Sequence, residues 1–218
     1  WAFPTQRGGF GLHGILTISP SQKVSYYWTW QIKTISGRMC IMDTHDLSWR
    51  SLNLEHTRSL GVCLGEALQG GELICLSGDL GAGKTALAYG IGQGWEALEA
   101  VHSPTFVFVH EHRRAADGMR LYHLDCYRLT SPEDAYSIGL EEMLAGDDPL
   151  LLEWAERITP LLPEDALWIR LEADPTDEGA RLIQFRAKGG PALRLLKIVQ
   201  GWINAAHSIT RKTDAVGD

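Results

Sequence analysis

The residues best suited to chemistry lie between positions 78 and 85, where GDLGAGKT matches the phosphate-binding pattern G-x-x-x-x-G-K-[ST]. The backbone amides of such a loop turn inward around a phosphate, and glycine adopts the required angles most easily. Lys84 supplies a mobile positive charge for the β- and γ-phosphates, and the hydroxyl of Thr85 is a ligand for Mg²⁺. A helical pattern follows the loop, so the positive end of that helix dipole faces the same anion. The predicted nucleotide-binding residues are Gly78, Asp79, Leu80, Gly81, Ala82, Gly83, Lys84, Thr85 and Ala86.

Two acidic residues end apolar strands further along the chain. Asp125 closes the run LYHLD, and Glu153 closes LLLE. Acids at the carboxyl ends of parallel strands beside a phosphate-binding loop face the bound nucleotide. One can hold Mg²⁺, directly or through water, while the other orients the attacking water. Lys84, Asp125 and Glu153 are therefore the predicted catalytic residues, and Thr85, Asp125 and Glu153 the predicted metal ligands. The competing interpretation is that both acids simply lie on the surface at strand ends.

Several side chains near these acids have more than one interpretation. Trp154 either stacks near the nucleotide or packs in the core. His123 is interpreted as a structural residue. Arg128 and Arg157 are both candidates to stabilise charge in a transition state, and the sequence does not choose between them.

The elements that must position these residues alternate between strands and helices. Apolar side chains recur at helical spacing over residues 56–68, and the short apolar run at 72–78 is typical of a buried parallel strand. Ser131 and Pro132 are a favourable N-cap and first residue for a further helix. Strands are predicted at 72–78, twice within 102–129 around a polar turn at 115–118, at the start of 148–158, and at 167–173 and 181–188; helices are predicted at 56–68, 84–95, 131–144, the end of 148–158 and 192–206. This alternation predicts a three-layer α/β domain of the P-loop NTPase type with a mainly parallel central sheet.

The two ends of the chain differ from this pattern. Residues 11–20 are apolar but lack the basic region and cleavage site of a signal peptide, and residues 24–35 alternate like a strand without carrying chemistry. We expect the native protein to start at Met39 or Met42. Residues 1–41 are then an extension outside a P-loop ATPase domain of residues 42–199. Residues 200–218 are predicted to hold the end of a helix and, after His207, a loose polar tail.

Composition limits the class of protein. The 218 residues are 44% hydrophobic and 22% charged, which fits one folded α/β domain. A net charge of −7 argues against a protein whose main role is to grip a phosphate backbone. No apolar run approaches the roughly 18 residues that span a bilayer. The cysteines show no C-x-x-C spacing and are interpreted as reduced thiols of a cytosolic protein: Cys40, Cys63, Cys75 and Cys126.

A phosphate-binding loop does not by itself name a reaction. A GTPase would carry N-K-x-D to read guanine, and the nearest string, RKTD at 211–214, lacks the asparagine. Adenine is therefore the favoured base. A small-molecule kinase would usually carry an arginine-rich lid, for which HEHRR at 110–114 is the candidate, although a solvated hairpin turn explains that string more simply. A free-standing P-loop kinase that phosphorylates a small metabolite stays the alternative function.

Five sequence blocks favour one family over these alternatives. GDLGAGKT, HSPTFVFV, LYHLDCYRL, IGLEEML and LLLEWAERI occur in the order and spacing of the TsaE (YjeE) family, over roughly residues 47–190. The family comprises small bacterial ATPases that help install threonylcarbamoyladenosine beside the anticodon of tRNAs. The resemblance implies ATP and Mg²⁺ as cofactors and a low intrinsic ATPase activity. It also implies stimulation by TsaB and TsaD as partners, contact with tRNA only through that assembly, and a cytoplasmic location away from membranes.

The resemblance adds one candidate segment and has two departures. Ser103, Pro104 and Thr105 resemble a switch loop that senses the γ-phosphate, although an ordinary turn into a strand would have the same sequence. Ala86 stands where many relatives have a second threonine, a change expected to matter little. The first forty residues resemble nothing in the family.

Overall fold

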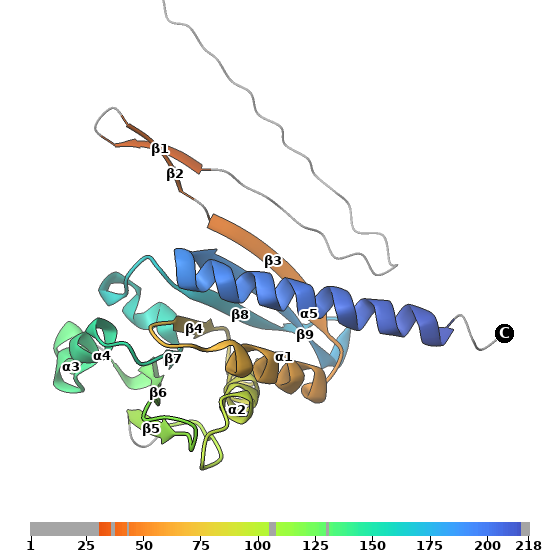
Figure 1. Cartoon of the computed structure of the whole chain (residues 1–218), viewed down its shortest axis with the longest axis horizontal. Coiled ribbons are helices and arrows are strands. Elements are labelled where there is room, and N and C mark those ends of the chain that lie inside the picture. Colours follow the sequence, from red (N-terminus) through yellow and green to blue (C-terminus); the bar gives the residue numbers. More distant parts are fainter. Residues whose placement is uncertain (1–30, 36–37, 43, 105–107, 130, 215–218) are drawn as a thin grey trace, which may run out of the picture.

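The computed structural model describes residues 31–35, 38–42, 44–104, 108–129 and 131–214. Its main feature is a seven-stranded sheet in the order β3-β9-β8-β4-β7-β6-β5 (Figure 1). The four inner strands β8, β4, β7 and β6 run parallel, whereas β5, β9 and β3 join them as antiparallel neighbours. The predicted mainly parallel central sheet is thus confirmed. The strands are β3 (Thr44–Ser51), β4 (Leu73–Ser77), β5 (Val109–Arg113), β6 (Arg120–Asp125), β7 (Leu150–Glu153), β8 (Leu167–Asp174) and β9 (Asp177–Lys188).

Successive residues of the central strand β4 face opposite sides of the sheet and enter two separate cores. Ile74 and Leu76 belong to the core shared with α1 (Leu54–Ala67), α2 (Lys84–Gly94) and α5 (Gly190–Asp214). Leu73 and Cys75 belong to the core under α3 (Pro132–Ser137), α4 (Leu140–Ala145) and the 3₁₀ segment η2 (Ala155–Leu161). A strand buried on both faces needs a continuous apolar run, which is the pattern that LICLS provides. The three predicted layers are therefore present.

Helices α1 and α2 approach each other so closely that only glycine fits between them. A Cβ on Gly65 would lie 2.1 Å from the carbonyl oxygen of Ile91, and one on Gly94 would lie 2.1 Å from that of Val62. Gly61 and Gly90 meet at the same contact. Gly90 and Gly94, which follow the phosphate-binding loop, therefore serve the packing of α2 against α1.

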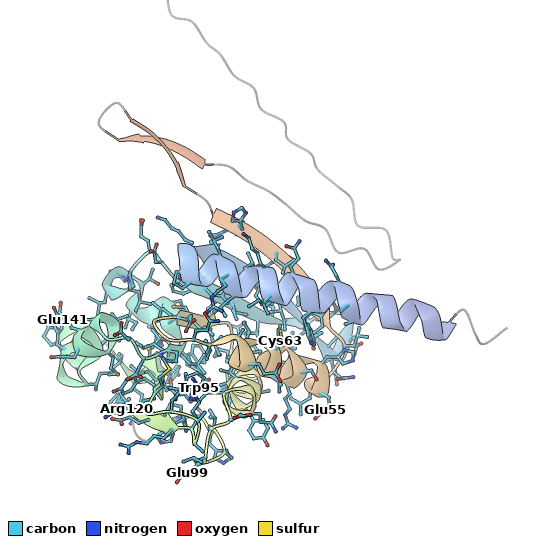
Figure 2. All side chains as sticks on the ribbon, in the orientation of Figure 1. Glu55, Cys63, Trp95, Glu99, Arg120 and Glu141 are labelled. Carbon is cyan, nitrogen blue, oxygen red and sulfur yellow. The ribbon has the colours of Figure 1, made fainter. Side chains whose placement is uncertain are left out.

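Side chains fill the space between the helices and the sheet (Figure 2). Trp95, directly after α2, is fully buried, whereas the carboxylates Glu55, Glu99 and Glu141 lie at the periphery. The guanidinium carbon of Arg114 lies 3.5 Å from the centre of the Trp95 ring. This contact joins the end of α2 to the β5–β6 hairpin.

The second helical layer begins as predicted but is broken in the middle. Ser131 accepts a hydrogen bond from the backbone N–H of Asp134, and the Asp134 side chain accepts one from the backbone of Ser131, forming a capping box with Pro132 at the start of the helix. Gly139 has φ 75°, so the single helix predicted over 131–144 is two short helices, α3 and α4. Between β6 and α3 lies a further 3₁₀ turn, η1 (Cys126–Arg128).

The ends of the chain depart from the sequence prediction in two ways. Strand β3, at the edge of the sheet, pairs with β9 over its full length and was not predicted. Helix α5 runs to Asp214, so the residues after His207 that were expected to form a loose tail continue the helix. No proline or glycine interrupts residues 202–214, which allows the helix to propagate. Ile203 is buried, so the packed domain also extends beyond residue 199.

Two short strands precede this domain. β1 (Gln31–Ile35) and β2 (Arg38–Met42) pair with each other in a separate two-stranded sheet, which stands apart from the seven-stranded sheet in Figure 1. Within the described ranges, no helix is both long and apolar enough to cross a membrane.

Candidate nucleotide-binding site

The loop between β4 and α2 has the backbone that phosphate binding requires. Gly78, Gly81 and Gly83 have φ values of 128°, 78° and 106°, a region that other residues rarely adopt. A Cβ on Gly78 would also lie 2.1 Å from the carbonyl oxygen of Leu171, so this position excludes any side chain. Gly83 is the N-cap of α2 and offers no side-chain acceptor, which leaves the first amides of the helix facing the loop. This arrangement is typical of an anion site at a helix N-terminus.

Lys84 lies inside the loop that it follows. Its ammonium donates to the carbonyl oxygens of Gly78 at 2.6 Å and Asp79 at 2.9 Å, and the side chain is almost completely buried. Its Nζ also lies 3.6 Å from the centre of the Trp154 ring. Burial lowers the pKa of Lys84, while the nearby carboxylates, first that of Glu153 and then that of Glu156, oppose the shift.

The two predicted acids lie side by side next to this lysine. Asp125 and Glu153 are register partners on the adjacent parallel strands β6 and β7, and both are buried. One carboxylate oxygen of Glu153, Oε2, accepts the hydroxyl of Thr85 at 3.0 Å. Oδ1 of Asp125 accepts the backbone N–H of Tyr127 at 2.9 Å. The interpretation of both acids as surface residues at strand ends is therefore wrong.

The donor set fits a magnesium nucleotide. The hydroxyl of Thr85 and the carboxylates of Asp125 and Glu153 supply hard oxygen ligands in one place, and Lys84 is the neighbouring cation. The residues described by the structure contain no group of three or more His, Cys, Asp or Glu side chains that could hold a metal alone. Mg²⁺ at nucleotide sites is usually held by one or two protein oxygens together with phosphate and water.

Two aromatic rings, those of Trp154 and Tyr127, lie beside Lys84. Trp154 has φ 58°, a strained conformation for a non-glycine residue, and its ring lies 4.9 Å from that of Tyr127 between centres. The guanidinium of Arg157 lies 4.6 Å from the Tyr127 ring, and that of Arg128 lies 4.3 Å from the Phe108 ring. Trp154 is half-buried beside the phosphate loop, so its contacts are with the site as well as with the core.

Three further residues touch the site without having been predicted there. Nε of Arg181, on β9, donates to the carbonyl oxygen of Ala82 at 3.1 Å, and Glu156 accepts a long hydrogen bond of 3.5 Å from the backbone of Gly78. His123 lies 3.0 Å from Glu153. The sequence carried a signal only for His123, which precedes Asp125 by two positions and therefore shares its face of the strand.

The predicted switch loop lies partly within the described chain. Ser103 is half-buried and Pro104 is buried, whereas Thr105 lies outside the described residues.

The remaining predicted residues of the phosphate-binding loop differ in exposure. Leu80 is 92% exposed, Asp79 and Gly81 are exposed, Ala82 is buried, and Ala86 is half-buried in the first turn of α2.

The fold and the loop together define the class of protein: a three-layer α/β domain of the P-loop NTPase type. The model of the family described as threonylcarbamoyl adenosine biosynthesis protein TsaE matches residues 51–183. The chain belongs to the TsaE family.

Individual relatives agree with this assignment. A TsaE described as a tRNA threonylcarbamoyladenosine biosynthesis protein, from Bacillus subtilis, is 36% identical over 144 residues, covering 66% of this chain and 87% of the relative. The protein of the same description from Nostoc is 40% identical over 131 residues, covering 58% and 77%. The crystal structure of Bacillus subtilis YdiB superposes with a TM-score of 0.61 at 31% identity, covering 72% of this chain and 95% of that one.

Proposed function

We propose that this protein binds and hydrolyses ATP with Mg²⁺ as a subunit of the machinery that forms threonylcarbamoyladenosine on tRNA, acting with TsaB and TsaD. The observation that carries the proposal is the convergence of Lys84, Thr85, Asp125 and Glu153 from three separate elements onto one glycine-rich loop. Membership of the TsaE family supports the pathway.

Each side chain has a role that follows from its position. The loop amides and Lys84 would hold the phosphates, and Lys84 would leave its two carbonyl partners to do so. Bound Mg²⁺ would neutralise negative charge that develops on the phosphates during transfer to water. Because Glu153 already contacts the hydroxyl of Thr85, it lies next to the predicted metal ligand. Asp125, the register partner of Glu153 on the neighbouring strand, would share the metal or orient the attacking water.

We expect the isolated protein to be a slow ATPase. The two arginines that the sequence offers for this role, Arg128 and Arg157, are exposed and lie against the rings of Phe108 and Tyr127. P-loop enzymes that await a partner gain about 10³–10⁵-fold in rate when missing transition-state groups arrive. We expect a smaller but clear stimulation by TsaB and TsaD. Because coupling between binding sites is reciprocal, ATP should also favour assembly with these partners.

The test measures ATP hydrolysis by the protein alone and with TsaB and TsaD, together with threonylcarbamoyladenosine formation on tRNA. Stimulation by the partners and dependence of the tRNA product on this protein would support the proposal. The alternative, a small-molecule kinase, would be favoured if the partners neither bind nor stimulate it and the tRNA product forms equally well without it.

A further inference from the structure

His123 and Glu153 form a buried pair at the candidate site. The His123 side chain is fully buried, that of Glu153 is 2% exposed, and Nε2 of the histidine lies 3.0 Å from Oε1 of the glutamate. The other carboxylate oxygen, Oε2, accepts the hydroxyl of Thr85. His123 and Thr85 thus contact different oxygens of the same carboxylate.

We propose that His123 is a positioning residue, whose Nε2–H holds the Glu153 carboxylate in the orientation that presents Oε2 to Thr85. This inference rests on the proposed function, because it assigns the histidine a purpose in the same site. A glutamate side chain has three rotatable bonds, and a single hydrogen bond to Thr85 would leave its carboxylate free to turn. The second donor, fixed on the neighbouring strand β6, removes that freedom.

The pattern of hydrogen bonds assigns the proton on the ring. A carboxylate oxygen that bonds to a ring nitrogen accepts from it, so our proposal assigns the donating hydrogen to Nε2. Nδ1 of His123 is buried, and no group in the part of the chain that the structure describes bonds to it. Glu153 is therefore the hydrogen-bond partner that orients this ring.

A merely structural role would predict a different pattern of variant effects. His112 provides the matched control, because its ring is also buried and lies 6.1 Å from that of His123 between centres. Burial lowers the pKa of His112 to about 4, so His112→Leu removes a neutral ring at neutral pH. If His123 only filled space, His123→Leu and His112→Leu would have similar effects.

The first experiment compares ATP turnover, KM and Mg²⁺ dependence in the full chain and three variants, with TsaB and TsaD present. Loss of a group that orients a metal-site ligand typically costs 10–100-fold, so we expect His123→Leu to lower kcat and raise the Mg²⁺ requirement by roughly that factor. The affinity for ADP without Mg²⁺ should be unchanged, because the phosphate loop is not altered. His123→Gln, whose amide can donate from a similar position, should recover most of the loss, and His112→Leu should lose little. Parental turnover in His123→Leu would overturn the inference, as would an equal loss in His112→Leu or no rescue by glutamine.

The second experiment does not depend on activity. Nitrogen-15 NMR of the nucleotide-free protein should show His123 as the Nε2–H tautomer, with ring signals that shift in Glu153→Gln. An Nδ1–H tautomer, or ring signals unchanged in that variant, would overturn the inference even if His123→Leu failed to fold. If the parent protein shows no ATPase activity, the proposed function fails, and the NMR result still decides whether the histidine orients the carboxylate.

Discussion

Replacing Glu153 by glutamine tests the candidate site most directly, because the change removes the charge of one carboxylate while keeping its shape. The carboxylate accepts two donors, the hydroxyl of Thr85 and a ring nitrogen of His123, each at 3.0 Å. The glutamine carbonyl can still accept one of them. The hydroxyl can rotate to accept from the new NH₂ group, so we expect a loss of folding free energy of about 1 kcal/mol or less.

The effect on catalysis should be much larger. If Glu153 orients water or holds Mg²⁺, its loss should cost about 10²–10⁴-fold in turnover, as for one positioned catalytic group. That factor corresponds to about 3–5 kcal/mol of activation free energy. Nucleotide affinity without Mg²⁺ should stay the same or rise, because a negative charge beside the phosphates has been removed.

Glu153→Ala shows how much the carboxylate contributes to folding stability, apart from its effect on catalysis. The alanine leaves the buried ring of His123 without its acceptor, at a cost of about 1–3 kcal/mol, whereas the exposed Thr85 can donate to water instead. For a chain of this size each kcal/mol lowers the melting temperature by roughly 2–4 °C. The assay is phosphate release with the partners present, with calorimetry for ADP binding and thermal unfolding as the stability control. Turnover near the parental value in Glu153→Gln would refute the assignment of this acid to the catalytic machinery.

Three more predictions follow from the same structure. Lys84→Ala should abolish ATP hydrolysis and greatly weaken nucleotide binding without unfolding the protein, and unchanged ATP affinity in calorimetry would contradict its role. A protein beginning at Met42 should fold and bind ATP, because β1 and β2 pair with each other in a sheet separate from the seven-stranded sheet; insolubility or loss of ATP binding would show that the domain needs them. Burial raises the thiol pKa of Cys63 to about 11 and that of Cys126 to about 12, and it raises that of Cys75 further. Since the thiolate is the reactive form, these three should resist iodoacetamide at pH 8 in the folded protein and react after denaturation, as mass spectrometry of the alkylated peptides would show; rapid alkylation of the folded protein would contradict their burial.

The parts of the site that could be predicted from sequence are those whose functional residues lie close together in the chain or follow a local pattern. The eight residues of GDLGAGKT carry the glycines, the lysine and the threonine of the loop within one short segment, so their spacing alone indicated phosphate binding. The helix start at Ser131 was equally local, because the capping box needs only residues three positions apart. Asp125 and Glu153 could be predicted because each ends an apolar strand, and parallel strands bring their carboxyl ends to one edge.

Other features depend on contacts between distant segments. Arg181 follows Ala82 by 99 positions. The residues around Arg181 form a strand pattern that gives no sign of its contact with the phosphate loop. Strand β3 exists because β9 offers an edge to pair with, and its own sequence, THDLSWRS, has little of the apolar character by which strands were predicted. The polar sequence after His207 predicts a loose tail, but helix α5 continues through it to Asp214.

The sequence by itself therefore determined which chemical groups the protein has and the order in which its elements carry them. The tertiary structure decided which groups act together. The parallel pairing of β4 with β7 brings the loop and Thr85 beside Glu153, and the parallel pairing of β6 with β7 brings His123 beside the same carboxylate. A histidine two residues before an aspartate has the same local pattern whether it is a core residue or the partner of a distant acid. Only the fold distinguishes the two, because the hydrogen bond joins residues 30 positions apart in the chain.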